Sequence, residues 1–525
     1  MPGRSESHAD LRAESVRSMG RGTTITIVGT IALFGLSFLG RVTAARELSI
    51  ADWGIYNLGI SLTGLLAIVS LLGLSQATAR SLAAEGDPSE QRAVARWAVA
   101  LATAIGVLTS LAVYFLAGPL ARLFSEPALA PVFEILSVTV GFSVFASVLA
   151  ATFQGFRDAF PNAVFNQALN PALFVVLVLT FFVLHAGLDG VLWATVGSTG
   201  GAFFGLLLYT GLKLRRHLAW RGPAAPRPRR ELWDLTLALW GVSSLAYITA
   251  FADTLVLGIY WPATTVGFYS AAMSLARLVL LAGATVTYIY LPVATRLEQR
   301  GANAEMRSIY VTATRWMLLL TMPFFLLFVF APELTIESVF GSGYGPGGAA
   351  LAILALSAFV SSAVGPVNAT LTGLAYARIQ LATAAVSAIV NVALSFLLIP
   401  RWGLLGAAAA WGIARALYPT LGLLAIYSER RLHPFQWVLV KPMAVALAVG
   451  GPLFYGMGHA HLPHYFVVPI YFLGAGIFLA ALVLTRAIVP DDLVAIDAIE
   501  RLVHRPMPRV RGWLVRHQAG PSPPA

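Results

Sequence analysis

Cysteine is absent from this chain of 525 residues, and charged residues are scarce, at 11% of the sequence. Without cysteine the protein can form no disulfide, thiol nucleophile, iron–sulfur cluster or cysteine-ligated zinc site. Hydrophobic residues make up 58% of the chain, well above the share in a soluble globular domain. Long apolar stretches recur from end to end, so this composition predicts a protein whose solvent is lipid.

Motifs for chemistry in water are also missing. No paired carboxylates, Ser/His/Asp set or HExxH motif lies in a water-facing domain, and the glycine-rich run at 341–348 lacks the lysine of a phosphate-binding loop. His459, His461 and His464 are typical of an exposed polar turn rather than a metal site. We therefore expect a protein that is not an enzyme and that holds no metal or organic cofactor.

Fourteen segments are long enough to cross the bilayer, because about 20 apolar residues span the hydrocarbon core as a helix that satisfies its own backbone hydrogen bonds. They are predicted at 23–45, 53–78, 96–117, 129–153, 162–185, 190–212, 234–259, 266–291, 309–331, 347–373, 379–400, 404–427, 441–457 and 465–487. The predicted fold class is all-α, a polytopic membrane protein with about fourteen transmembrane helices.

The net charge of +11 is explained by topology. Lys and Arg accumulate in short cytoplasmic loops, and with the N-terminus inside, 28 of the 35 basic residues fall on that side. The predicted external loops 186–189, 260–265, 332–346 and 458–464 contain none. We expect a multi-pass protein of the cytoplasmic membrane with both termini in the cytoplasm, an uncleaved first helix and no nucleic-acid partner.

A basic, proline-rich connector divides the spans into two halves with similar patterns. Asn170-Pro-Ala-Leu173 resembles Asn391-Val-Ala-Leu394, and Gly54-Ile-Tyr56 resembles Gly267-Phe-Tyr269. Equal orientation of the two halves predicts a pseudo-two-fold axis along the membrane normal. The predicted units are a cytoplasmic tail (1–22), a six-helix lobe (23–212), a cytoplasmic linker (213–233), a second six-helix lobe (234–427), two additional helices (428–487) and a cytoplasmic tail (488–525).

Three stretches carry a family resemblance: 253–272, the Phe340-Gly-Ser-Gly-Tyr344 loop and 391–414. They resemble the polysaccharide (Wzx-type) flippases of the multidrug/oligosaccharidyl-lipid/polysaccharide exporter superfamily. The resemblance implies two lobes around a central cavity and alternating access that moves a polyprenyl-diphosphate-linked oligosaccharide from the inner to the outer leaflet. It also implies membrane lipids as partners, and a polysaccharide polymerase or glycosyltransferases acting beside the protein.

Three alternatives stay open. A lipid II flippase of peptidoglycan synthesis also has fourteen spans and a basic cavity. A cation-coupled multidrug exporter of the same superfamily shares the two-lobe plan, but it usually stops at twelve spans and prefers an acidic cavity. A multispan glycosyltransferase would need acidic catalytic residues in a large external loop, and the external loops predicted here are short.

Charged residues inside the spans are the candidate site, because burying a charge at mid-bilayer costs about 2.5–3.5 kcal/mol on the insertion scale and such groups seldom face lipid. Arg277 and Arg415 lie near the centres of their spans, and each either binds a substrate diphosphate or makes a structural contact. Arg41 and Arg46 lie near the outer end of the first span, where the side chain can also extend to the interface. Arg315, near the inner end of its span, fits a structural role better.

Acidic and amide side chains complete the candidates. Asp253 and Glu134 could bind a proton or Na⁺ and couple transport to an ion gradient. The repeat alignment places Asp253 within one position of the counterpart of Arg41, which suggests that the two approach each other between the lobes. Amide groups suit sugar hydroxyls but serve equally well in contacts between helices, and the candidates of this kind are Asn166, Asn170, Asn368 and Asn391.

Overall fold

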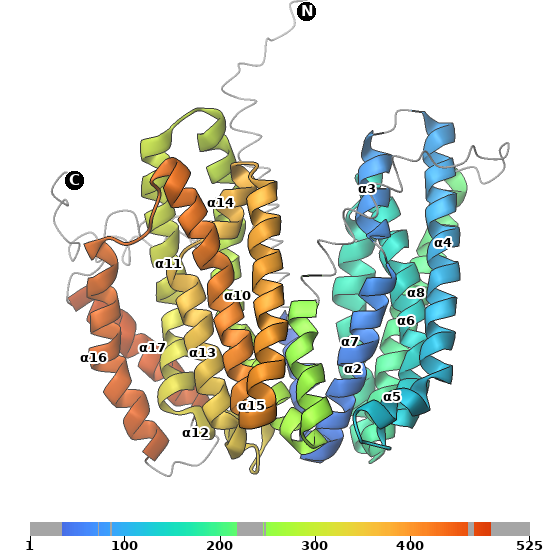
Figure 1. Cartoon of the computed structure of the whole chain (residues 1–525), viewed down its shortest axis with the longest axis horizontal. Coiled ribbons are helices and arrows are strands. Elements are labelled where there is room, and N and C mark those ends of the chain that lie inside the picture. The colour runs from blue at the N-terminus through green and yellow to red at the C-terminus, as the bar shows by residue number, and fades with distance from the viewer. Residues whose placement is uncertain are drawn as a thin grey trace, which may run out of the picture.

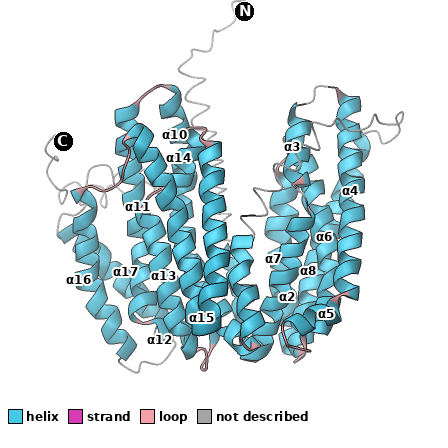
Figure 2. Cartoon of the chain, viewed as in Figure 1, coloured by secondary structure: helices cyan, strands magenta, loops and turns pink. Residues whose placement is uncertain are grey.

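The structure is a computed structural model that describes residues 34–71, 73–84, 87–217, 245, 248–459 and 467–484. These residues form helices and connecting loops, with no strand among them (Figure 2). The predicted tails and residues 218–233 of the linker lie outside the described residues. The all-α prediction is confirmed.

The N-terminal group of helices holds the first six predicted spans. Its elements are a helix over 34–47, α2 (Ile50–Ser70), α3 (Leu74–Ala84), α4 (Pro88–Phe115), α5 (Ala117–Leu123), α6 (Leu129–Gly155), the π-helix η1 (Asn162–Leu169), α7 (Asn170–Val183) and α8 (Gly187–His217). The helix α6 packs against α2, α3, α4 and α8 and forms the centre of this lobe.

The C-terminal group holds the remaining spans. Its elements are a helix over Ile248–Tyr260, α10 (Ala263–Gln299), α11 (Asn303–Phe330), α12 (Pro332–Phe340), the 3₁₀ turn η2 (Gly345–Gly347), α13 (Gly348–Ala363), α14 (Val367–Gly373), α15 (Ala377–Arg430), α16 (Trp437–His459) and α17 (Val467–Leu484). The last two helices pack against each other and against α11.

Helix lengths fit a bilayer. Ten helices of the described part are long and apolar enough to cross a membrane, and every predicted span overlaps a helix. At 54 residues, α15 would measure about 80 Å if straight, but Gly403 interrupts it with φ 49° and ψ −121°. The chain reverses there, so α15 supplies two predicted spans. Large apolar side chains such as Phe115 and Val183 are 73% and 75% exposed, as expected for a lipid-facing surface.

Several helices differ from the predicted spans at their ends: α4 and α7 end two residues earlier than predicted, and α10 and α15 continue beyond the predicted ends. The helix α10 continues to Gln299, whereas its span was predicted to end at 291, because hydropathy detects only the part of a helix that lies in lipid. The short helices α5 and α12 were not predicted, since each has fewer than ten residues.

The two groups of helices lie together at the end that carries α5 and α12, and their ribbons diverge toward the end that carries α3 and α14 (Figure 1). We call the first the α5–α12 end and the second the α3–α14 end. The main contact between the groups is that of α2 with α10. Gly54 and Gly267, the residues matched by the repeat, permit it: a Cβ atom on Gly54 would overlap the carbonyl oxygen of Ala263, and one on Gly267 would overlap that of Ile50.

Candidate interlobe site

Arg41 connects the two lobes. Its Nη2 atom donates to Oδ1 of Asn57 on α2 at 2.9 Å, and its Nε atom donates to Oγ of Ser274 on α10 at 3.3 Å. The guanidinium carbon lies 5.7 Å from the centre of the Trp53 ring, within the range of a cation–π interaction. One half-buried cation is therefore held by its own lobe and by the opposite one.

Asp253 lies in the helix over Ile248–Tyr260 and is fully buried. The hydroxyl group of Tyr269, on α10, donates a hydrogen bond to its Oδ2 atom. Arg277, two turns further along α10, exerts its charge on this carboxylate. The side chain of Arg277 is itself exposed, so a cation on α10 is accessible beside a buried carboxylate.

Arg277 also acts electrostatically on Arg41, and these two like charges come from different lobes. Two cations and one carboxylate give the group a net positive charge. Arg41, Arg277 and Asp253 form no salt bridge with any described residue, so none of the three charges is neutralised by a direct ion pair. An anion that reached both arginines would relieve their repulsion.

The sequence predicted an approach of Arg41 to Asp253, but in this structure each has a different partner. Arg41 bonds to Asn57 and Ser274, and Asp253 bonds to Tyr269. Both lobes nevertheless join their first helix to their second by a hydrogen bond between residues sixteen positions apart. The pattern is shared, but its polarity differs: a cation forms the bond in one lobe and a carboxylate in the other.

The other candidates make no described hydrogen bond or salt bridge with this group. Arg415 is half-buried on α15, its charge interacts with Tyr418, and its Nε atom has no partner among the described residues. Asn391 is fully buried in the C-terminal lobe, and neither amide atom has a described hydrogen-bond partner. Asn368, on α14, and Glu134, on α6, are exposed. Among the described residues, no hydrogen bond or salt bridge joins these side chains to Arg277.

Sequence reasoning missed the neutral partners Asn57, Tyr269 and Ser274. Polar side chains of this kind are common in membrane helices and carry no signal of their own. The repeat did offer a signal for Tyr269. Tyr56 and Tyr269 occupy matched positions, and each follows by sixteen residues the matched positions Gly40 and Asp253. Tyr56 bonds instead to Thr195 on α8 at 3.1 Å, so the copies have diverged.

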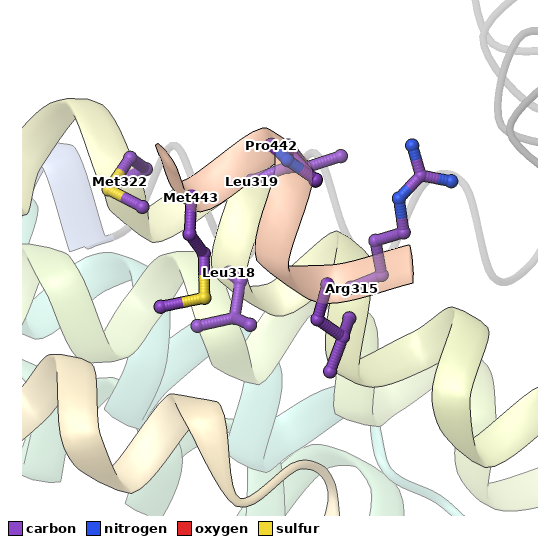
Figure 3. Close-up of a pocket in the computed structure, with 7 residues that line it drawn as sticks. Arg315, Leu318, Leu319, Met322, Pro442 and Met443 are labelled. Carbon is purple, nitrogen blue, oxygen red and sulfur yellow. The ribbon is translucent and has the colours of Figure 1, made fainter. Parts of the chain in front are cut away.

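Arg315 lies at a small apolar pocket between α11 and α16, with Leu318, Leu319, Met322, Leu439, Pro442 and Met443 as its lining. Its guanidinium group extends away from Met322 and Met443 (Figure 3). The side chain is 2% exposed and packs where α16 covers α11. This position agrees with a structural role for Arg315.

Comparison with known proteins identifies the family. A family profile described as "Polysaccharide biosynthesis protein" matches residues 19–298, more than half of the chain. The chain belongs to this family. It is a membrane transporter, and its resemblance to the exporter superfamily named above is confirmed. None of the curated proteins compared with it matches.

Solved structures of several transporters share the fold of this polysaccharide biosynthesis protein. The lipid II flippase MurJ, in an inward closed conformation, has a TM-score of 0.68 at 13% identity over 90% of this chain and 99% of its own. A multidrug resistance MATE family transporter in an inward-facing conformation has a TM-score of 0.63 at 16% identity, over 77% and 98%. A transporter of the same superfamily from Pyrococcus furiosus has a TM-score of 0.55 at 17% identity, over 78% and 94%. At these identities the likeness establishes the fold and leaves the substrate open.

Proposed function

We propose that this protein is a flippase that carries a polyprenyl-diphosphate-linked oligosaccharide from the inner to the outer leaflet during assembly of a surface glycan. The observation that carries the proposal is the pair Arg41 and Arg277, two cations from opposite lobes whose charges repel. A diphosphate is a divalent or trivalent anion with many acceptor oxygens, and guanidinium groups bind such oxygens through charge-assisted, often bidentate, hydrogen bonds.

The position of the pair suggests how binding is linked to movement. Arg41 already touches both lobes, whereas Arg277 is exposed on α10. An anion held by both would attach the lobes to each other at this level. The anion would be released when the lobes separate and the two arginines move apart. The site would then bind the anion more tightly when the lobes are together than when they are apart, and alternating access requires such a difference in affinity.

Orientation completes the proposal. We infer that the α5–α12 end is external, because α12 lies in the predicted external loop 332–346, which contains no Lys or Arg, and the other predicted external loops carry few basic residues. The state described here is then closed outside, where Gly54 and Gly267 meet α10 and α2, and it receives substrate from the cytoplasm. Both termini lie in the cytoplasm in this arrangement.

The arginine pair disfavours an exporter of cationic drugs, which a net positive site would repel. Lipid II carries the same diphosphate, so the charges alone do not separate the leading proposal from this alternative. The two differ in the sugar, and the transport assay must therefore compare both lipids.

The test is transport in reconstituted vesicles together with binding of undecaprenyl diphosphate to the purified protein. Arg41→Ala and Arg277→Ala should each weaken binding about tenfold or more, since hydrogen bonds to charged groups contribute roughly 1.5–3 kcal/mol. Lys at either position should restore binding only in part, because it keeps the charge and loses the planar fork.

Arg401→Ala, which removes an exposed arginine elsewhere on the C-terminal lobe, is the matched control and should bind normally. Normal binding and transport by a well-expressed Arg41→Ala/Arg277→Ala variant would refute the proposal. Transport of lipid II in preference to oligosaccharide-bearing lipids would favour the alternative.

A further inference from the structure

The π-helix η1, over Asn162–Leu169, is unusual in length and composition. π-helical turns are rare, mostly occur as single bulges within α-helices and concentrate at functional sites. This one continues for eight residues and contains three carboxamide side chains: Asn162, Asn166 and Gln167. Asn170 follows at the first position of α7.

Pro171 explains why the helix widens here. Proline lacks an N–H group and its ring clashes with the carbonyl group four residues earlier, which in an α-helix would be that of Gln167. The chain avoids this clash with wider turns, and the N–H group of Asn170 bonds to the carbonyl oxygen of Phe165, five residues back. The wider turns therefore lie directly before this proline, where they leave room for its ring.

The matched segment of the other lobe lacks that proline and has a different structure. Val392 takes the place of Pro171, and α15 is a regular α-helix through Asn391. Asn391 is fully buried, whereas Asn170 is half-buried. The substitution thus accompanies a change from a buried amide to a set of accessible amides in the N-terminal lobe.

Packing indicates which surface these amides occupy. No residue of η1 is fully buried, and Gln167 is exposed. The following helix α7 contacts the first helix of the lobe, since a Cβ atom on Gly40 would press against Phe174, and it lies on the side of the lobe toward the C-terminal group (Figure 1). Amide groups facing hydrocarbon are costly, so the interlobe side is the favourable environment for them.

The amides retain free hydrogen-bonding capacity. Asn166 donates through Nδ2 to Oδ1 of Asn162 at 3.0 Å. This leaves the Nδ2 group of Asn162 and the Oδ1 atom of Asn166 available, and Gln167 has no hydrogen-bond partner among the residues described. Each carboxamide offers two N–H donors and an acceptor oxygen, the complement of a sugar hydroxyl group, which both donates and accepts.

We propose that Asn162, Asn166 and Gln167 form a glycan subsite that binds the neutral, hydroxyl-rich sugar next to the diphosphate while the substrate is loaded. This inference rests on the proposed function and assigns the sugar of that substrate to the N-terminal lobe, apart from the arginine pair that binds its charge. In this proposal the π-helical turns place the amides where they can bind the sugar, and Pro171 maintains those turns.

Two probes separate the roles: undecaprenyl diphosphate without sugar, and the same lipid bearing a short oligosaccharide. The Asn166→Leu/Gln167→Leu variant should bind the oligosaccharide lipid about tenfold more weakly, as expected for two lost hydrogen bonds, and bind the sugar-free lipid as the parent does. Pro171→Val, which introduces the residue of the other lobe, should have the same selective effect without removing an amide. Asn166→Gln, which keeps the carboxamide, should restore part of the affinity.

Thr180→Val, on the exposed face of α7 where the hydroxyl bonds only to its own helix, is the matched control and should leave both affinities unchanged. Equal weakening for the two lipids, or no weakening for either, would overturn the glycan subsite while the proposed function stands. Failure of the parent protein to bind or transport either lipid would instead overturn the proposed function.

Discussion

Arg46, on the first helix, donates a hydrogen bond of 2.8 Å to the carbonyl oxygen of Val339, near the last residue of α12 in the opposite lobe. It donates a second, of 2.6 Å, to the carbonyl oxygen of Ser338. The final carbonyl groups of a helix lack intrahelical partners, and the negative end of the helix dipole attracts a cation. An arginine of one lobe therefore caps a helix of the other, and Tyr344 supports the contact by donating to the carbonyl oxygen of Ala45 at 3.2 Å.

Removing this cap should favour separation of the lobes at the α5–α12 end. Arg46→Ala should shift the balance toward the open state by about 1 kcal/mol, the scale of an exposed charge at a helix terminus, or roughly fivefold. Because the chain has no cysteine, spin labels on Leu123→Cys and Trp402→Cys, both exposed near this end, report the separation directly. Longer label distances should become more populated.

The matched control is Arg122→Ala, which removes another exposed arginine near the same end. It should leave the distance distribution as it is in the parent. If Arg46→Ala and Arg122→Ala shifted the distribution equally, the effect would come from surface charge in general and the cap would have no role.

The glycine pair makes a second prediction about the same contact. Backbone lies opposite Gly54 and Gly267, so no side chain can rotate away to make room for a methyl group. Gly54→Ala and Gly267→Ala should each disfavour the state that is closed at the α5–α12 end by about 1–3 kcal/mol, the usual cost of overpacking. The same label pair measures the shift, and transport should fall with it.

Gly118→Ala tests whether the effect depends on contact. Gly118 lies on α5, and no atom lies within 4 Å of the position that a Cβ atom would take there, so an alanine at this position should behave as the parent. If both Gly54→Ala and Gly267→Ala kept the label distances of the parent, the prediction would be wrong, and α2 and α10 would be able to separate slightly without opening that end.

Much of this fold was predictable because lipid imposes one strong rule. A spanning segment must be apolar and helical, and segments such as 129–153 were predicted to within two residues of α6. Elements outside the hydrocarbon need not follow that rule, so hydropathy gives no signal for them, and α5 and α12 were missed. The reversal between α15's two halves was predicted as a loop at 401–403, and Gly403 is where the structure turns.

The site was only partly predictable. The rarity of intramembrane charge identified Arg41, Arg277 and Asp253, which the structure brings to the lobe interface. A single sequence does not fix how far each helix rotates about its axis, however, and this rotation decides that Asp253 meets Tyr269 rather than Arg41. The same uncertainty concealed the burial of Asn391 and the exposure of Asn368, although both are amides in apolar surroundings.

Topology gives a further prediction. Cysteines at Ser342 and Gln299, exposed residues near the α5–α12 and α3–α14 ends respectively, should react with a membrane-impermeant thiol reagent from opposite sides, Ser342 from outside. Ser342 is preferable to its neighbour Gly343, whose φ of 108° a cysteine would adopt only with strain. Labelling of both positions from one side would contradict the proposed orientation and the number of spans between them.

The last prediction concerns Asp253 and coupling to an ion gradient. A fully buried carboxylate that is bonded to Tyr269 and acted on by Arg277 contributes one negative charge to an otherwise cationic group. Proton or Na⁺ binding would neutralise it, leave the repulsion between Arg41 and Arg277 uncompensated and favour separation of the lobes. An ion shifts this balance only by the difference in its affinity for the two states, and the contacts around Asp253 are ones that movement of α10 would change.

Asp253→Asn should therefore retain downhill movement of substrate in vesicles but lose the response to an imposed pH or Na⁺ gradient. Tyr269→Phe should keep the response and change its size, because the carboxylate remains while its hydrogen-bond donor is removed. Glu134→Gln, at an exposed position, is the matched control and should respond as the parent does. If Asp253→Asn still responded fully and Glu134→Gln did not, the coupling site would be Glu134, and the pair of Asp253 with Tyr269 would be a static contact between two helices of one lobe.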